Sequence, residues 1–402
     1  MGVLGIFGAM RHRAFQLYWT GMILSVLAPN MEFVAIAGLV LDLTNSPVLL
    51  GLTAMVNAAP IIALNLIGGA AADRMNRQRL LQLVQAVSTI LYFALAFLIA
   101  TKLVQFWHVL VFAFVIGSAR AFDGPTRMAL MPQVVPRDDL PSAVSLINVV
   151  WQLPRLVGPA VAGVLIATVG IGPSFLFSGI GALGALIAFS ALRLSQPVVT
   201  GQGSFFKDIL EGLRYIRSSP VISTLIAMTF FNSVFGMSYI FMEAVFARDV
   251  LDVGSEGFGL METAGGLGAL VGVLAAAHFT RQGKKGRQAI VGSITFGSSL
   301  VAFAWTPWFA VSLALLFLAG LFCQLYMTTI LTALQLTVPD EVKGRVLGLF
   351  GLTYSLIPLG ATISGTITQL ANAPIAVSLG GLAVAALAIV VALEVPRVRD
   401  LA

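Results

Sequence analysis

The sequence predicts an all-α integral membrane protein with twelve transmembrane helices in two pseudo-symmetric six-helix bundles. Three observations lead to this class: the scarcity of charged residues, the number of long apolar segments and a repeat between the two halves of the chain. Of the 402 residues, 58% are hydrophobic and only 10% are charged, whereas soluble domains average about 25% charged residues. So few charges cannot cover a soluble fold, which excludes a soluble enzyme, a nucleic-acid-binding domain and a disordered chain.

Twelve segments are long and apolar enough to cross a bilayer, which takes about 20 residues of helix. The connections between them are short, so no room remains for a large soluble domain. The predicted spans are residues 15–41, 47–71, 80–101, 106–129, 142–169, 172–193, 220–246, 257–279, 288–305, 308–336, 346–371 and 374–394.

The positive charges orient these spans. If both termini are cytoplasmic, 19 of the 23 Lys and Arg residues fall on the inner side, Lys102 and Arg248 fall outside, and Arg120 and Arg155 lie within spans. Because Lys and Arg concentrate in cytoplasmic loops, this bias predicts an even number of spans with both ends inside. It also explains the net charge of +6 without a nucleic-acid partner. The apolar run after the N-terminal arginines is too long for a signal peptide, so we expect no cleaved leader.

The longest polar break, roughly residues 194–219, separates six spans from six. The predicted domains are therefore 1–193 and 220–402, joined by this linker on the cytoplasmic side. Apolar and charged residues fall on opposite faces of its second part, which predicts an amphipathic helix on the membrane surface, or a simple linker helix. The sequence around Pro136 is repeated around Pro339, 203 residues later. Two repeated six-helix halves with a substrate site between them are a transporter design.

Cysteine and histidine usage predicts no disulfide, metal or cofactor. Cys323 is the single cysteine, so no internal disulfide can form. His12, His108 and His278 lie far apart in the sequence, without the spacing of a metal site.

The connection between the second and third spans reads Gly69-Ala-Ala-Ala-Asp73-Arg74-Met-Asn76-Arg77-Gln-Arg79. It resembles the loop signature of the major facilitator superfamily, G-x-x-x-D-R-x-G-R-[RK]. Asn76 replaces a glycine, and Asn is the next best residue for a left-handed turn. The resemblance implies a gating loop that latches the two halves on the inner side, formed by Gly69, Asp73, Arg74, Arg77 and Arg79. The alternative is a plain positive loop that only sets the topology.

The fifth span reads Pro154-Arg155-Leu-Val-Gly158-Pro159-Ala-Val-Ala-Gly163. It is similar to the antiporter motif of the superfamily, G-x-x-x-G-P-x-x-G-G, with Pro154 in place of the first glycine and an alanine in place of the third. This resemblance implies export in exchange for protons. Small residues permit close helix packing, and Arg155 is expected to be a second buried cation, near mid-span, that needs a partner.

The fourth span carries Arg120 and Gly124, which fit the superfamily pattern R-x-x-x-G. An arginine at the centre of a membrane helix costs about 2.5–3.5 kcal/mol, so it should face a cavity or a partner. Asp123 lies on nearly the same helix face, so one interpretation is a neutral Arg120–Asp123 pair.

Few carboxylates lie in the apolar spans, and a carboxyl group in such surroundings can bind and release a proton. The candidates for proton coupling are Glu32, Asp123 and Glu262, and Glu32 is the first choice because it lies well inside a span. The alternatives are a salt bridge from Glu32 to Arg155 or Arg120, and an interfacial position for Glu262. Glu243 is expected at the outer end of its span.

The resemblance covers the whole chain, which looks like the bacterial subgroup of the superfamily that includes enterobactin-exporter-like and macrolide-efflux-like proteins. It implies a proton-coupled exporter of small amphipathic organic molecules, such as drugs or siderophores, working by alternating access. Implied partners are the substrate, protons and lipids, for a monomer in the bacterial inner membrane. The alternatives are a lysolipid or lipid translocator, or a proton-symporting importer. An enzyme is not expected, because the sequence has no HExxH, G-x-S-x-G or Walker motif.

Overall fold

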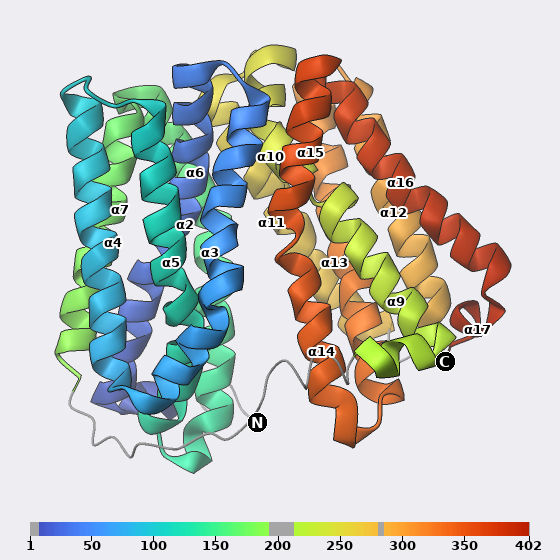
Figure 1. Cartoon of the computed structure of the whole chain (residues 1–402), viewed down its shortest axis with the longest axis horizontal. Coiled ribbons are helices and arrows are strands. Elements are labelled where there is room, and N and C mark those ends of the chain that lie inside the picture. Colours follow the sequence, from blue (N-terminus) through green and yellow to red (C-terminus); the bar gives the residue numbers. More distant parts are fainter. Residues whose placement is uncertain (1–7, 193–212, 280–284, 402) are drawn as a thin grey trace. The chain divides into compact units, whose positions relative to one another are not determined.

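The computed structural model describes residues 8–192, 213–279 and 285–401. Within these ranges, the description excludes the side chains of residues 65–74, 277–279 and 340–341, and of some positions between 128 and 152. The chain forms two compact units, one from Met1–Thr44 with Val56–Gly203 and the other from Asn45–Met55 with Ser204–Ala402. Figure 1 shows that the long segments of both units are helical.

The first unit contains the helices of the first six spans. In chain order they are η1 (Gly8–Arg11), α2 (Arg13–Thr44), α3 (Pro47–Arg74), α4 (Arg77–Ala100), α5 (Phe106–Leu130), η2 (Met131–Gln133), η3 (Arg137–Asp139), α6 (Leu140–Val169) and α7 (Ile171–Ser190). The first turns of α3 belong to the second unit by their contacts, since that unit includes Asn45–Met55.

The second unit contains the helices of the last six spans. They are α9 (Pro220–Phe231), η4 (Asn232–Gly236), α10 (Tyr239–Val245), η5 (Phe246–Val250), α11 (Gly254–Phe279), α12 (Lys285–Trp305), α13 (Phe309–Thr337), α14 (Asp340–Tyr354), α15 (Ile357–Leu370), α16 (Ala373–Glu394) and α17 (Pro396–Arg399). Of the predicted amphipathic linker helix, residues 204–212 lie outside the described residues, and residues 213–218 are helical.

Twelve segments among the described residues are long and apolar enough to cross a membrane, which confirms the predicted all-α membrane fold. A helix is the natural form for such segments because lipid offers no partner to backbone N–H and C=O groups. Polar residues mark several helix starts: Asn76 and Asn372 accept hydrogen bonds from backbone N–H groups three residues later, at 3.0 and 2.9 Å. These contacts satisfy donors that the first helical turn leaves open.

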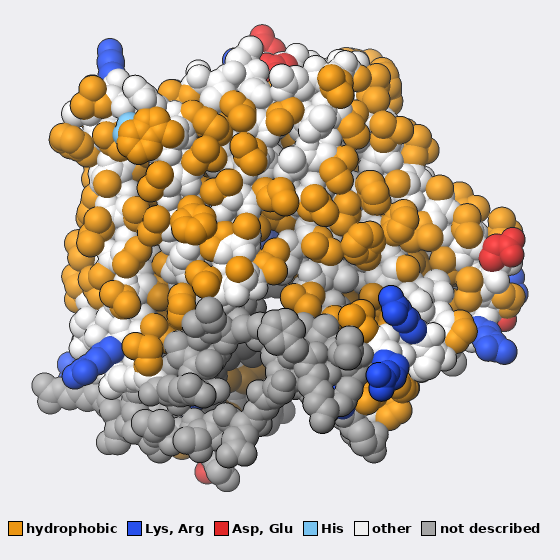
Figure 2. Space-filling model, viewed as in Figure 1, with side chains coloured by type: hydrophobic (Ala, Val, Ile, Leu, Met, Phe, Trp, Pro, Cys, Tyr) orange, Lys and Arg blue, Asp and Glu red, His pale blue; other side chains and the backbone are white. Residues whose placement is uncertain are grey.

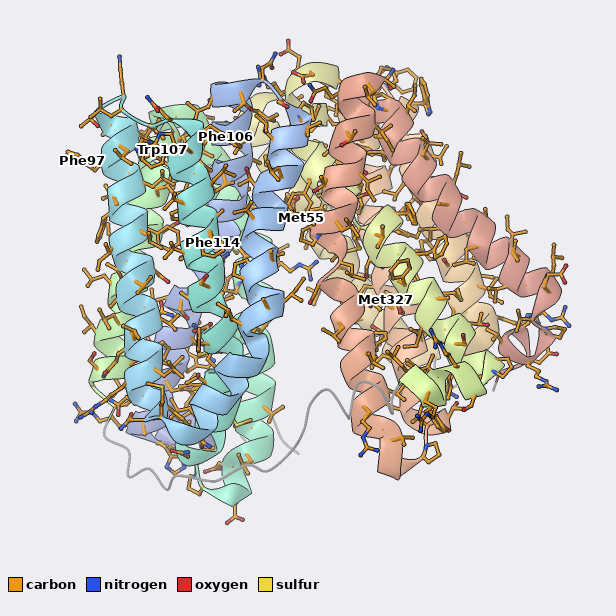
Figure 3. All side chains as sticks on the ribbon, viewed as in Figure 1. Met55, Phe97, Phe106, Trp107, Phe114 and Met327 are labelled. Carbon is orange, nitrogen blue, oxygen red and sulfur yellow. The ribbon has the colours of Figure 1, made fainter. Side chains whose placement is uncertain are left out.

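The surface of the spans is apolar, as lipid requires. Figure 2 shows hydrophobic side chains across most of the visible face, with Lys and Arg toward its edges. Phe97 on α4 and Trp107 and Phe114 on α5, labelled in Figure 3, are each more than half exposed. In a membrane these large side chains face lipid, so their exposure needs no protein partner.

Corresponding spans pack in the same way within each unit. In the first unit α4 lies against α5 and α7, and in the second α12 lies against α13 and α16. The chain also turns alike after the first and seventh spans, where Asn45 and Asp252 have positive φ values of 49° and 50°. Asn and Asp are the side chains that best tolerate this left-handed conformation. Both observations fit a repeat of two six-helix halves.

Two spans that the sequence predicts as continuous are interrupted. The seventh contains two π-helical segments, in which Met237 N donates to Asn232 O at 2.7 Å and Leu251 N donates to Phe246 O at 2.8 Å. The eleventh breaks between α14 and α15, just before Pro358. Pro358 has no N–H to continue the helical bonding, whereas π segments depend on local packing that a hydropathy pattern does not record.

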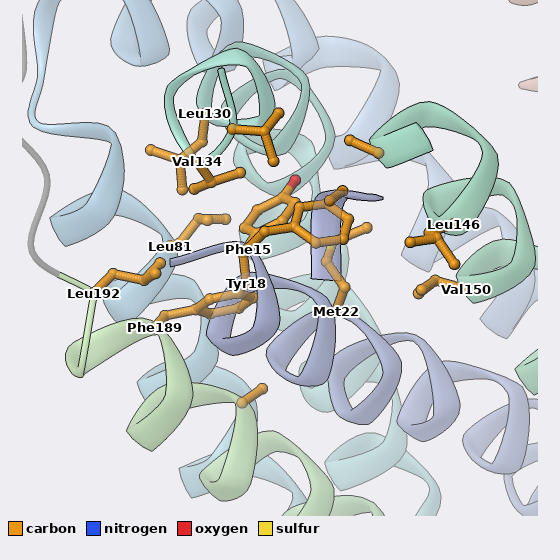
Figure 4. Packing of buried hydrophobic residues seen from close by; sticks show 14 of the residues in the cluster. Phe15, Tyr18, Met22, Leu81, Leu130, Val134, Leu146, Val150, Phe189 and Leu192 are labelled. Atoms are coloured by element: carbon orange, nitrogen blue, oxygen red, sulfur yellow. The ribbon is translucent and has the colours of Figure 1, made fainter. Parts of the chain in front are cut away.

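The core of the first unit gathers around α2 near its N-terminal end (Figure 4). Phe15, Tyr18 and Met22 on α2 lie against Leu81 of α4 and Phe189 of α7, all at most 1% exposed. The rings of Tyr18 and Phe189 lie 6.2 Å apart between centroids. This cluster fixes α2, which carries the central polar residue of the unit.

Candidate functional site

Glu32, Tyr92 and Arg120 form a buried polar cluster in the first unit. They come from α2, α4 and α5. The Tyr92 hydroxyl donates a 2.5 Å hydrogen bond to Glu32 Oε2, and the Arg120 guanidinium forms an ion pair with the same oxygen. Arg120 Nη2 also donates to the Tyr92 hydroxyl at 3.2 Å. The cluster therefore joins the first, third and fourth spans through one carboxylate oxygen.

Burial makes these contacts strong. Glu32 is 6% exposed and Tyr92 is 1% exposed, and the Tyr92 ring packs against Phe112 with centroids 5.6 Å apart. A buried charge is tolerated only when an opposite charge and hydrogen bonds compensate it. Arg120 supplies that charge to Glu32, so among the two partners considered from the sequence it is Arg120, and not Arg155, that pairs with Glu32.

The interpretation that Arg120 and Asp123 neutralise each other is wrong. Asp123 Oδ2 instead accepts a 2.5 Å hydrogen bond from Arg127 Nε, one turn further along α5. Arg127 Nη1 also donates to Ser25 Oγ at 2.7 Å. Arg120 and Arg127 lie about two turns apart on α5 and pair with different acids: Arg120 with Glu32 of α2, and Arg127 with Asp123 of α5 itself.

Arg155 does not have the buried position that the sequence suggests. It lies in α6 with its side chain exposed in the unit, and Glu32 is paired with Arg120 instead. Its neighbours Leu153 and Val157 are also exposed, at 48% and 41%. Arg155 thus belongs to an outward face of α6 rather than to the polar cluster.

The antiporter-like motif lies in α6, where Pro154, Gly158, Pro159 and Gly163 are all buried. A Cβ added to Gly158 would come within 2.6 Å of Asn30 Cβ on α2. No side chain can occupy that position without moving one of the helices. The motif therefore sets a close approach of the fifth span to the first, two residues before Glu32.

The predicted gating loop is described only in part. The side chains of Gly69, Asp73 and Arg74 lie outside the described residues. Arg79 is exposed and Arg77 is half-buried, which leaves the latch a prediction.

Asn76 does not adopt the left-handed turn that the sequence suggests. It has φ −65° and ψ 109° and caps α4 by accepting from Arg79 N at 3.0 Å. The left-handed conformation is therefore unnecessary here, and Asn fits because it is among the best N-cap residues.

The second unit holds the other two acids of interest. Glu262 lies in α11, two turns after its start at Gly254, so it is deeper in its span than the sequence predicts. Glu243 is expected at the outer end of the seventh span, but it lies in α10, the helix continues after it to Val250, and its side chain is 1% exposed. The predicted span ends too early, because the polar residues of η5 continue the helix to Val250.

The family described as transmembrane secretion effectors matches residues 4–402, almost the whole chain. The chain belongs to this family of major facilitator transporters. It is therefore a multi-pass membrane transporter and not an enzyme.

Two relatives of this transporter are named as export proteins, and a solved transporter structure shares its fold. The multidrug efflux pump Tap of Mycolicibacterium fortuitum is 29% identical over 92% of this chain and 93% of its own length. The enterobactin exporter EntS of Shigella boydii is 21% identical over 97% of this chain and 94% of its own length. The fold resembles that of a peptide transporter, POT, with a TM-score of 0.78, 13% identity and coverage of 96% and 95% of the two chains.

The sequence does not predict the contacts of three polar residues of the transporter. Tyr92 is one tyrosine in an apolar span, and only helix packing places it on Glu32. The charge count from the sequence places Arg127 with the 19 Lys and Arg residues of the inner side, because hydropathy falls toward the end of the fourth span. Gln78 donates to Phe189 O at 2.8 Å and to Leu192 O at 2.6 Å, tying the start of α4 to the end of α7. Its position next to the Asp-Arg loop is the one signal that points to it.

Proposed function

We propose that this transporter is a proton-coupled exporter of small amphipathic organic molecules, such as drugs or siderophores. The observation that carries the proposal is the family match together with relatives named as a multidrug efflux pump and an enterobactin exporter, each covering more than nine-tenths of both chains. The antiporter-like motif in α6 supports export over import. The proposed setting is the bacterial inner membrane, with both termini cytoplasmic, a monomer surrounded by lipid and no cofactor besides the proton gradient.

Glu32 is the proposed site of proton coupling. It takes a proton from the outside and releases it inside, in exchange for an outgoing substrate. Protonation removes the negative charge that pairs with Arg120, so the ion pair is lost while Arg120 stays charged. A change in this pair shifts the populations of outward- and inward-facing states. The membrane potential contributes about 2.3 kcal/mol per charge per 100 mV, so one proton per cycle drives appreciable accumulation. Asp123 and Glu262 are the reserve candidates.

The coupling test is Glu32→Gln in reconstituted vesicles with an imposed pH gradient. Gln keeps the shape of the side chain and removes its titration, so we expect uphill export to be lost while exchange of substrate down its gradient continues. Asp42→Asn, an exposed acid on the same helix, is the matched control and should export as the parent does. Uphill export by Glu32→Gln at the parent rate would show that another group couples the proton.

The substrate test is a transport panel in a strain that lacks its own efflux pumps. Expression of the transporter should reduce accumulation of amphipathic drugs or raise secretion of a siderophore, and a proton uncoupler should abolish the effect. Lysolipids in the same panel test the translocator alternative. Increased uptake of any substrate would indicate an importer and contradict the proposal.

The Asp73 loop is the proposed gate, on the motif match at the inner end of the second span. An acid at a helix end can bind a basic group or the positive end of another helix, and this contact would stabilise one conformation. Asp73→Asn should then slow transport several-fold while membrane insertion and thermal stability stay at parent levels. An unchanged transport rate would show that the loop only sets the membrane topology and does not gate transport.

A further inference from the structure

The second unit holds two acids that the coupling proposal for Glu32 does not use. Glu243 lies in α10 and Glu262 in α11; η5 continues the seventh span to Val250, and residues 251–253 then connect it to the eighth span, which runs antiparallel to it. The Tyr239 hydroxyl lies 3.8 Å from the Cβ position of Gly265. Glu243 is one turn after Tyr239, and Glu262 is one turn before Gly265. In antiparallel helices these steps lead to the same level, so the two carboxyl groups lie close enough for the charge of one to act on the other.

Glu243 has no positive partner among the described residues. It is 1% exposed, and its Oε2 has no hydrogen-bond partner in the described part of the chain. A carboxylate that is buried in this way without compensation is costly. The site around Glu243 therefore requires a positive charge that no described side chain supplies to it.

The elements packed against α10 are η5, α11, α15 and α16. Their charged groups, besides Glu262, are Arg248 and Asp249 on η5, Glu256 on α11 and Glu394 at the far end of α16. Arg248 donates to Asn45 Oδ1 at 2.8 Å and lies 3.5 Å from Asp249 Oδ1. Glu256 is exposed, and α15 carries no charged residue. Within the described part of the chain, Glu262 is the charged group that acts on Glu243.

The burial of Glu243 limits which cation can compensate its charge. An organic cation cannot reach a carboxyl group that is almost wholly buried. Among the described residues no group of three or more His, Cys, Asp or Glu could hold a metal ion. A proton needs no volume, and it turns one carboxyl group into a donor while the other remains an acceptor.

We propose that Glu243 and Glu262 share one proton, held as an O–H···O hydrogen bond between their carboxyl groups. This gives the second unit a proton site of its own, separate from Glu32 and independent of what the transporter carries. Two carboxylates at close range repel each other. Loss of the proton therefore drives α10 away from α11, which makes this contact sensitive to proton release.

The test is infrared spectroscopy of the full-length purified transporter in lipid nanodiscs. A protonated carboxyl group has a carbonyl stretch that shifts on transfer to heavy water. At neutral pH we expect one such slowly exchanging band in the parent and in Glu32→Gln. Glu243→Gln and Glu262→Gln should each lose it, and Glu256→Gln, an exposed acid on α11, should keep it.

Three outcomes overturn the proposal. The first is a parent without a protonated carboxyl band, a result that needs no variant. The second is a band that persists in both Glu243→Gln and Glu262→Gln. The third is a band that disappears in Glu32→Gln, which would place the bound proton on Glu32 and support the coupling proposal while excluding this one. Because the measurement needs no substrate, failure of the export proposal leaves it interpretable.

Discussion

Arg127 forms a buried ion pair near the C-terminal end of α5 in the first unit. Its side chain is 3% exposed and pairs with Asp123 at 2.5 Å, and its guanidinium lies 5.6 Å from the centre of the Phe189 ring. Removing one member of a buried ion pair leaves the other uncompensated and costs about 3–5 kcal/mol. We expect Arg127→Ala to lower the thermal unfolding midpoint of the purified protein accordingly.

The matched control is Arg79→Ala, because Arg79 is an exposed arginine in α4 and should be nearly neutral. The double variant Asp123→Ala with Arg127→Ala should recover part of the loss, since no charge is then left unpaired. If Arg79→Ala destabilised the protein as much as Arg127→Ala, the buried pair would not be the cause.

Single charges inside apolar runs are visible in the sequence, but their partners are not. Glu32 and Arg120 are both singled out because each interrupts a hydrophobic segment. Whether Arg120 pairs with Glu32 or with Asp123 depends on how α5 is rotated about its axis, which the packing of neighbouring helices decides. Sequence spacing favours Asp123 as the partner of Arg120, but in the structure Asp123 pairs with Arg127.

At the scale of elements, the contact between α2 and α6 rests on a missing side chain at Gly158. A Cβ at this position would lie 2.6 Å from Asn30 Cβ and 3.4 Å from its carbonyl carbon. Gly158→Ala must therefore separate the helices locally, and overpacking of this kind costs about 1–3 kcal/mol. We expect a lower unfolding midpoint and slower transport, because Asn30 lies two residues before Glu32.

Gly124→Ala on α5 is the control, because a Cβ there has no neighbour within 4 Å. Alanine favours helix over glycine by up to about 1 kcal/mol, so this variant should be neutral or slightly stabilising. Equal stability of Gly158→Ala and Gly124→Ala would show that α2 and α6 are less closely coupled than the structure indicates.

The spans themselves follow from hydropathy because lipid forces every apolar segment of sufficient length into a helix. The interruptions within the spans cannot be predicted from hydropathy. The π segment η4 places Asn232 Oδ1 2.7 Å from the Cβ position of Gly236, a local fit that no periodicity records. Glu243 is misplaced for the same reason, since η5 extends the seventh span beyond the point where apolar residues end.

At the scale of the whole molecule, the repeat is the most predictable feature, because it is written in the sequence as similar segments 203 residues apart. The left-handed Asn45 and Asp252 give it a physical basis: both end the first span of a half with the same turn. The linker between the halves is less predictable. Its apolar face predicts a helix, and residues 213–218 are helical.

The topology of the chain can be tested with substituted cysteines. Cys323 is the only cysteine and is buried, so a membrane-impermeant maleimide should react weakly with the parent. The charge bias predicts that Lys102, exposed in the turn between α4 and α5, faces the outside, and that Arg399 in α17 faces the cytoplasm. Lys102→Cys should therefore be labelled in intact cells stripped of their outer barrier, and Arg399→Cys only in inverted vesicles. Labelling of Lys102→Cys in inverted vesicles alone would reverse the orientation, and with it the direction of transport assigned to the proton at Glu32.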